Sequence, residues 1–259
     1  MKIAVIGCGV IGSALARHFA DKNQVLLIDR TYQKSLALAQ ELGSVAYDSS
    51  IEAIEKAEMV VIAFKPKDLA AFAKETAHAF KHAPIVVSVL AGTPVALLKS
   101  LFPSLIVRIM PNLPMICGEG VIGFVNTPEI TQENKIMIEK TFEGLGLLHW
   151  LTEGHLEALS AIAGSGPAFN FVVIQAMIDS GVMLGFTRDE AKEYVLKTME
   201  GAVALLRATG KSPAELTAQV ASPGGTTMAG LKVLEEGNIH ELLISTYRAT
   251  FNRAKELQK

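Results

Sequence analysis

Three glycines near the N-terminus have the spacing of a phosphate-binding turn. Gly7, Gly9 and Gly12 form a G-x-G-x-x-G pattern between a short apolar run and a helical pattern, and Asp29 ends the next apolar run. The glycines let backbone N–H groups approach a pyrophosphate, and the N-terminus of the following helix adds free N–H groups and positive dipole. A carboxylate at Asp29 suits a ribose hydroxyl. The pattern predicts a nicotinamide or flavin dinucleotide site.

Asp29 favours NADH, whereas the two residues that follow it favour NADPH. Asp29 would repel a 2′-phosphate, whereas Arg30 and Thr31 could hold one through a guanidinium fork and a hydroxyl. A second loop, Ala63–Pro66, follows the fourth apolar run and is expected to face the cofactor, because ligands lie beyond the carboxyl ends of parallel strands. The residues predicted to bind the dinucleotide are Ile6, Gly7, Gly9, Val10, Ile11, Gly12, Asp29, Arg30, Thr31, Ala63, Phe64, Lys65 and Pro66.

A glycine pair near the C-terminus suits a second anion. In the run Ser222–Thr227, Ser222 can cap a helix beginning at Pro223, and Gly224 and Gly225 then leave the N–H groups of its first turn bare. A plain Ser-Pro helix start explains Ser222 and Pro223. It does not explain the glycines, which each cost a helix about 1 kcal/mol relative to Ala. The run predicts a carboxylate site flanked by the hydroxyls of Thr226 and Thr227.

Two other runs offer polar groups next to predicted element ends. Ser165, within Gly164–Phe169, can cap a helix whose first turn holds Pro167, and plain helix initiation explains it equally well. Asn112, within Met110–Pro114, could hydrogen-bond the nicotinamide or the substrate; the alternative is a rigid Pro-x-x-Pro loop. Ser165 and Asn112 are therefore candidate substrate-binding residues.

The first 152 residues alternate short β-branched runs with helical periodicity. This alternation predicts an α/β fold, a Rossmann-type doubly wound parallel sheet. The edge strands are expected at Gly120–Val125 and Leu148–Thr152, separated by a helix over Thr131–Gly144. The other expected strands are Lys2–Gly7, Gln24–Asp29, Ser44–Tyr47, Glu58–Phe64, Pro84–Leu90 and Leu105–Met110. The other expected helices are Val10–Ala20 and Leu69–Phe80.

Residues 153–259 carry only helical patterns and predict an all-α C-terminal domain for substrate binding and dimerisation. One helix, Pro167–Leu184, is apolar nearly all round, and a small bundle cannot cover such a helix alone. We therefore expect an oligomer that buries Phe171, Val172, Ile174 and Met177 or their neighbours. The expected helices are Glu153–Ala163, Pro167–Leu184, Arg188–Ala208, Ala214–Val220, Pro223–Glu236 and Ile239–Leu257.

Composition narrows the class of protein. Of 259 residues, 50% are hydrophobic and the net charge is −2, so a large core is expected and a basic field for nucleic acid is not. Two cysteines are too few to stabilise a chain of this length through disulfide bonds, so we expect a cytoplasmic protein with free thiols. No window reaches about 18 charge-free apolar residues, so we expect no membrane partner. His78 and His82 lie at i, i+4 without a third ligand, and no metal site is predicted.

The motifs together resemble the pyrroline-5-carboxylate reductase family. The glycine loop, Phe64–Pro66, Met110–Pro114, Gly164–Phe169 and Val220–Thr227 occur in that family's order and spacing, over essentially the whole chain. The resemblance implies reduction of 1-pyrroline-5-carboxylate to L-proline, the last step of proline biosynthesis, with NADPH or NADH. It also implies a homodimer interleaved through the C-terminal helices, often assembled into decamers. We expect both cofactors to work, NADPH modestly better.

The resemblance places the substrate at the glycine pair, with Thr227 as the catalytic contact to the ring nitrogen and Ser222, Gly224, Gly225 and Thr226 around the carboxylate. Departures from the family pattern occur at Leu113, Ala163, Phe169, Ala218 and Ala221, and Asp29 stands where the members that use NADPH tend to carry Asn or Ser. They leave two alternatives: a reductase of another cyclic imino acid, or a non-catalytic dinucleotide-binding relative. A β-hydroxyacid dehydrogenase is disfavoured because Pro167–Leu184 contains no Lys to serve as its base.

Overall fold

The structure, a computed structural model, describes residues 1–256. It divides into two compact units: Met1–Ser165 together with the chain from Thr250 onward, and Gly166–Ala249. Each unit is described by itself below. The predicted domain boundary between residues 152 and 153 stays a prediction.

The first unit is built on an eight-stranded sheet in the order β3-β2-β1-β4-β5-β6-β7-β8. The first six strands are parallel, which confirms the doubly wound α/β fold. The order reverses between β1 and β4, so the loops after these two strands open at one crevice. The strands are β1 (Lys2–Ile6), β2 (Gln24–Ile28), β3 (Val45–Ala46), β4 (Met59–Ile62), β5 (Ile85–Ser88), β6 (Leu105–Met110), β7 (Gly120–Val125) and β8 (Gly146–Leu151).

The last two strands correct a prediction. Of these two strands, only β8 lies at an edge of the sheet; β7 lies between β6 and β8 and runs antiparallel to β6. The reason is the connection, since only a short turn that includes the 3-10 helix η3 (Leu113–Cys117) joins β6 to β7. A parallel return needs a crossover of a dozen or more residues, and α6 (Gln132–Phe142) supplies one between β7 and β8.

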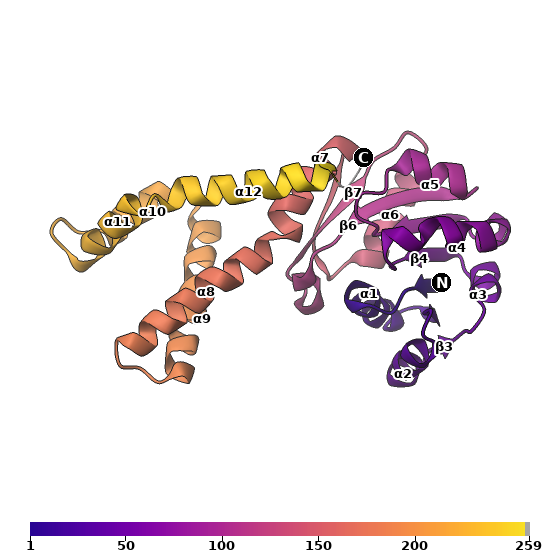
Figure 1. Cartoon of the computed structure of the whole chain (residues 1–259), viewed down its shortest axis with the longest axis horizontal. Helices are drawn as coiled ribbons and strands as arrows, with labels where there is room; N and C mark the ends of the chain where they lie inside the picture. Colours follow the sequence, from indigo (N-terminus) through magenta and orange to yellow (C-terminus); the bar gives the residue numbers. More distant parts are fainter. Residues whose placement is uncertain (257–259) are drawn as a thin grey trace. The chain divides into compact units, whose positions relative to one another are not determined.

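Helices cover both faces of this sheet (Figure 1). Along β1, Ile3 and Val5 pack on one face and Ala4 and Ile6 on the other, which explains why the strand reads as apolar throughout. One face is covered by α1 (Val10–Ala20), α2 (Tyr32–Leu42) and α6; the other is covered by α3 (Ser50–Lys56), α4 (Leu69–Thr76), α5 (Val95–Leu101) and α7 (Glu153–Leu159). The helix predicted over 69–80 ends at Thr76 and continues as the 3-10 helix η2 (Ala77–His82).

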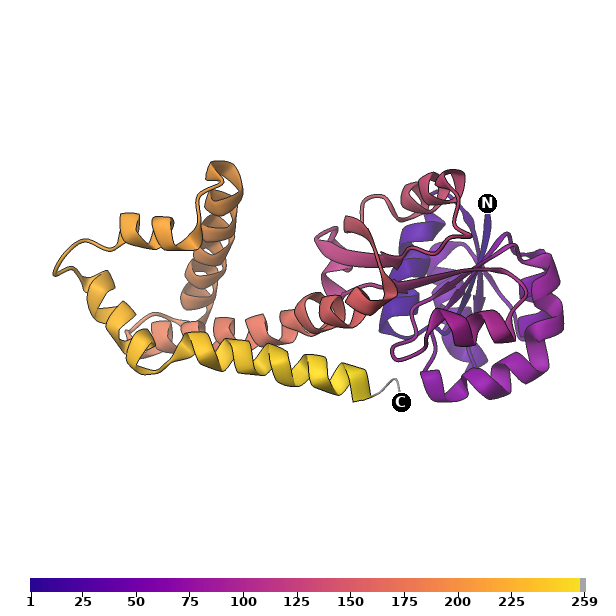
Figure 2. The ribbon, with the colours of Figure 1, turned by 90° about the horizontal axis from the view of Figure 1, so that it is seen from above.

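The second unit is helical and almost coreless (Figure 2). Within Gly166–Ala249 the only buried residues are Gly166, Ile178, Ala191 and Leu216. The predicted helix end at Leu257 lies outside the described residues. The helices are α8 (Gly166–Met183), α9 (Arg188–Thr209), α10 (Pro213–Val220), α11 (Thr226–Glu236) and α12 (Ile239–Glu256).

Two predicted helices after residue 152 differ from the structure by more than one residue. The helix predicted over 153–163 is α7 followed by a π-helix, Ser160–Gly164. The helix predicted from Pro223 begins only at Thr226, because Gly224 has a left-handed backbone (φ +70°) that no helix accommodates.

One helical stretch has the length and composition of a membrane span. Among the described residues, Glu153–Met183 contains an 18-residue window of mean hydropathy 1.5, of which only 17% is buried. The sequence expectation overlooked it because small and polar residues such as Ser160, Gly164 and Asn170 interrupt its apolar run. The stretch includes α8, whose Phe171 and Val172 are 58% and 70% exposed in the single chain.

Candidate functional site

The glycine loop connects β1 to α1 at the predicted position. Gly7 has a φ of +104°, and a Cβ there would lie 2.7 Å from the carbonyl carbon of Ala63. A Cβ on Gly12 would collide with the Gly7 carbonyl, whereas one on Gly9 would meet only open space. Gly9 is the N-cap of α1 and brings no side chain to cap it. The backbone here is open to an incoming group and bare at the helix N-terminus, which fits a dinucleotide pyrophosphate.

Asp29 is tied to the glycine loop by one carboxylate oxygen and to its own loop by the other. Oδ2 accepts a hydrogen bond from the Cys8 N–H at 2.8 Å, and Oδ1 accepts one from the Thr31 N–H at 2.9 Å. The negative charge is therefore held in a fixed position at the carboxyl end of β2. A carboxylate has further lone pairs for a ribose hydroxyl, so these bonds orient the group without filling it.

The loops after β2 and β4 meet through an ion pair. Arg30 Nη1 lies 3.8 Å from Asp68 Oδ1, and the Arg30 side chain is 86% exposed. Asp68 ends the 3-10 helix η1 (Pro66–Asp68), for which Lys65 is the N-cap residue. The structure thus brings the glycine loop, Asp29–Thr31 and Ala63–Pro66 together on one unit.

Cys8 within the glycine loop is not a nucleophile. Burial, reinforced by the negative charge of Asp29, raises the pKa of the Cys8 thiol to about 12. The thiol donates to the Ile28 carbonyl, with Sγ 3.7 Å from the oxygen. The thiol therefore stays protonated at neutral pH.

The glycine pair lies in the second unit, before α11. The Gly225 N–H donates to the Ser222 carbonyl at 3.0 Å, so this donor is engaged within a turn. Gly225 is the N-cap of α11 and has no side chain to cap it. The N–H groups offered to an anion are consequently those of Thr226, Thr227 and Met228, because α11 begins three residues later than the helix predicted from Pro223.

A hollow of about 570 Å³ adjoins this helix start. Its lining residues are Gly224, Gly225, Met228, Ala229, Leu231, Lys232 and Glu235. The hollow opens beside the bare helix N-terminus, and its lining combines glycine backbone, the apolar side chains of Met228, Ala229 and Leu231, and the charged Lys232 and Glu235. Thr227 is half-buried and does not line the hollow.

Asn112 and Ser165 lie in the first unit and make internal contacts. The Asn112 amide donates from Nδ2 to the Ala163 carbonyl at 2.9 Å, and its Oδ1 accepts from the Val121 N–H at 2.8 Å. The Ser165 N–H donates to the Ser160 carbonyl at 3.0 Å and closes the π-turn.

Sequence reasoning missed a buried charged cluster behind β6. Arg108 is 1% exposed and donates to Glu153 at 2.8 Å and to Glu157 at 3.1 Å, both on α7. Glu153 also accepts from the Val95 N–H at the start of α5. The Arg108 Nε finds no partner among the described residues. The sequence did contain a signal for this cluster: Arg108 is a charged residue in an otherwise apolar strand, and Glu153 and Glu157 lie at i, i+4 on a later helix.

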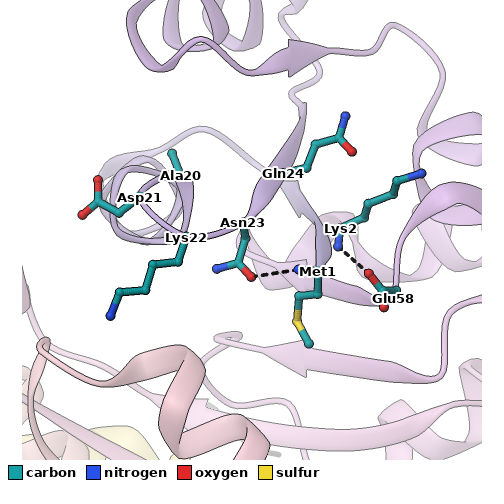
Figure 3. A pocket seen from close by; sticks show the side chains of 8 residues that line it. All are labelled: Met1, Lys2, Ala20, Asp21, Lys22, Asn23, Gln24 and Glu58. Carbon is teal, nitrogen blue, oxygen red and sulfur yellow. Dashed lines mark hydrogen bonds between the residues drawn. The ribbon is translucent and has the colours of Figure 1, made fainter.

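A second hollow, of about 580 Å³, lies at the amino ends of β1 and β2, whereas the glycine loop follows the carboxyl end of β1 (Figure 3). It is lined by the first residues of β1 and β2 and the end of α1. The Met1 ammonium donates to Asn23 at 3.3 Å, and the Lys2 N–H to Glu58 at 2.7 Å. Ligands of doubly wound sheets bind beyond the carboxyl ends, so this hollow is not the dinucleotide site.

The mostly parallel sheet, the bare glycine loop at its switch point and the fixed Asp29 define a Rossmann-type dinucleotide-binding protein with a helical second unit. Residues 2–92 match the family model "NADP oxidoreductase coenzyme F420-dependent", and residues 153–257 match "Pyrroline-5-carboxylate reductase dimerisation".

Relatives match along the whole chain. The pyrroline-5-carboxylate reductase of Aquifex aeolicus is 32% identical, covering 99% of this chain and 97% of the relative, and that of Corynebacterium melassecola is 32% identical over 99% and 98%. The solved reductase from Coxiella burnetii has a TM-score of 0.87 at 30% identity, covering 99% and 98%. The chain belongs to the pyrroline-5-carboxylate reductase family.

A more distant structure shares the fold alone. The 3-hydroxyisobutyrate dehydrogenase of Mycobacterium tuberculosis is 15% identical, with a TM-score of 0.51, covering 82% of this chain and 72% of its own. Helix α8 of the present chain has no Lys, the base that β-hydroxyacid chemistry would need.

Proposed function

We propose that the protein catalyses the NAD(P)H-dependent reduction of 1-pyrroline-5-carboxylate to L-proline. The observation that carries this function is the match to reductases of that name over 99% of the chain. The family models match both the dinucleotide-binding residues and the dimerisation segment.

The bound dinucleotide supplies the hydride, which adds to the imine carbon. The chain's share is to bind and orient. The glycine loop and the N-terminus of α1 offer N–H groups to the pyrophosphate, and Asp29 lies where the adenosine ribose is expected. The protonated iminium accepts hydride readily, so no strong side-chain acid is required. Water exclusion and a fixed ring orientation are the remaining requirements.

The substrate carboxylate is assigned to the start of α11. The bare N–H groups of Thr226 and Thr227 support this assignment, together with the helix dipole behind them. The ring nitrogen adjoins the carbon that bears the carboxylate, so the Thr227 hydroxyl on the same turn can donate to or accept from it. Thr227 is therefore proposed as the residue that orients the ring, and Ser222, Gly224 and Gly225 shape the turn.

Self-association completes the second unit. The exposed apolar residues of α8 and the dimerisation match over 153–257 support a homodimer through the C-terminal helices, and assembly of dimers into a decamer is part of the same proposal. The substrate is a small molecule, and neither nucleic acid nor membrane is expected as a partner. The free thiols of Cys8 and Cys117 support a cytoplasmic location.

One assay tests the reaction. Purified protein is mixed with racemic 1-pyrroline-5-carboxylate and either NADPH or NADH, and the absorbance of the reduced nicotinamide is followed; it should fall with both cofactors as L-proline accumulates. A parallel assay replaces 1-pyrroline-5-carboxylate with a six-membered cyclic imino acid, and preferential reduction of that ring would assign another substrate. Dinucleotide binding without reduction of either ring would make the chain a non-catalytic relative.

A further inference from the structure

A single helical stretch, Glu153–Met183, carries the chain from the first unit into the second, and it is irregular where it crosses. The Ser165 N–H donates to the carbonyl of Ser160, five residues back, rather than to the residue four back. This π-turn precedes Gly166, where α8 begins, and Pro167, which has no N–H.

Pro167 leaves one carbonyl without its usual donor. In a regular helix the Ala163 carbonyl would accept from the N–H of residue 167, and a proline there offers none. The Asn112 side chain supplies the donor instead, with Nδ2 2.9 Å from the Ala163 oxygen. The contact bridges 51 residues of sequence, from the end of β6 to the π-turn.

The other end of the same amide is also engaged. Asn112 Oδ1 accepts from the Val121 N–H at 2.8 Å, just beyond the last β6–β7 pair, Met110 with Gly123. A carbonyl must face the NH₂ group and an N–H must face the oxygen, so the amide has one orientation. Asn112 is only 6% exposed. Its side chain joins three backbone segments: the end of β6, the start of β7 and the π-turn.

We propose that Asn112 is a positioning residue: it fixes the Ala163–Ser165 turn, and through it Ser165, rather than contacting substrate or nicotinamide itself. The turn needs this support because Pro167 has removed the bond that would otherwise hold it. The consequence for catalysis rests on the proposed reductase function, whereas the consequence for the turn does not.

The first test replaces the donor alone. Asn112→Asp keeps an oxygen for the Val121 N–H but sets an acceptor against the Ala163 carbonyl. Amide hydrogen exchange in a peptide covering residues 160–168 should become about tenfold faster, and kcat/KM for the imine should fall about tenfold, with the dinucleotide Kd unchanged. Asn112→Ser, which is uncharged and too short to bridge both partners, should give the same pattern if the Asp variant does not fold.

Asn23→Asp is the matched control. Asn23 makes the same kind of double contact at the end of α1, donating to Phe19 at 3.1 Å and accepting from the N-terminal ammonium. It lies far along the chain from the π-turn, so both readouts should stay at the wild-type level. Equal exchange and equal kcat/KM in the Asn112 and Asn23 variants would overturn the proposal.

Pro167→Ala provides a rescue that only this role predicts. It restores an N–H at residue 167, which can bond the Ala163 carbonyl when Asn112 cannot. Added to Asn112→Ser, it should bring exchange and kcat/KM to within about threefold of wild type. A failure to rescue, or a dinucleotide Kd that rises with the loss of kcat/KM, would show that Asn112 acts elsewhere. A wild-type protein that reduces no imine would refute the function, while the exchange measurements would still decide the role of Asn112.

Discussion

Asp29 is the residue at which a single charge should decide between cofactors. Its carboxylate cannot swing away from a 2′-phosphate without breaking the bonds from the Cys8 and Thr31 N–H groups. The neighbouring Arg30 is 86% exposed and lies 3.8 Å from Asp68, so part of its positive charge is already balanced. Asp29→Asn removes the negative charge while keeping the shape of the side chain.

The expected change in the relative binding free energy of NADPH and NADH follows from the solvent exposure of the site. Unit charges about 4 Å apart in a water-like dielectric interact by about 1 kcal/mol, and a 2′-phosphate carries about two charges. Removing the Asp29 charge should therefore favour NADPH by about 2 kcal/mol, or about thirtyfold in the ratio of Kd for NADH to Kd for NADPH. The Asn amide also loses one of the two backbone bonds, so the unfolding midpoint should fall by a few degrees.

The assay is a titration of each dinucleotide into the free protein, followed by its fluorescence, and repeated as kcat/KM with the imine. Glu41→Gln is the control variant. Glu41 lies on α2, the helix that follows Asp29, and its carboxylate forms an exposed ion pair with Arg17, so its removal should leave the ratio of the two Kd values unchanged. If Asp29→Asn weakens both dinucleotides equally and leaves their ratio within about twofold, Asp29 only ties the loop and does not face the ribose.

Three further outcomes are expected. Thr227→Ala should lower kcat/KM for the imine by about one to two decades and leave dinucleotide affinity nearly intact, and Thr226→Ala should do less because its backbone N–H remains; steady-state kinetics and fluorescence titration measure both. Val172→Asp should lower the assembly mass seen by light scattering, because Val172 is 70% exposed on α8, and a wild-type mass of 27.7 kDa would contradict self-association. Arg108→Met should lower the free energy of unfolding by about 3–5 kcal/mol in denaturant titrations, since it removes the buried guanidinium that pairs with Glu153 and Glu157 of α7, whereas Arg17→Met in an exposed pair should cost about 1 kcal/mol or less.

Local patterns in the sequence were sufficient for the first unit's plan. Apolar runs and glycine spacing act over a few residues, so β1, α1 and the bare turn between them could be predicted to within a residue or two. The same holds for α9 and α10 of the second unit, whose starts are marked by the capping residues Thr187 and Ser212, whereas the start of α11 was predicted three residues too early. The helix predicted over Pro167–Leu184 has no polar face, and this pattern predicted self-association of the chain.

Side-chain partners distant in sequence were decided only by the tertiary structure. That Asp29 points back to the glycine loop, that Arg108 pairs with α7 and that Asn112 reaches the π-turn all depend on contacts between segments brought together by the sheet. The direction of β7 was likewise open, because an apolar run has the same pattern whichever way it pairs. Sequence periodicity reports which face of an element is buried. It does not report which distant polar group satisfies a buried donor or acceptor, and that choice is made when the chain packs.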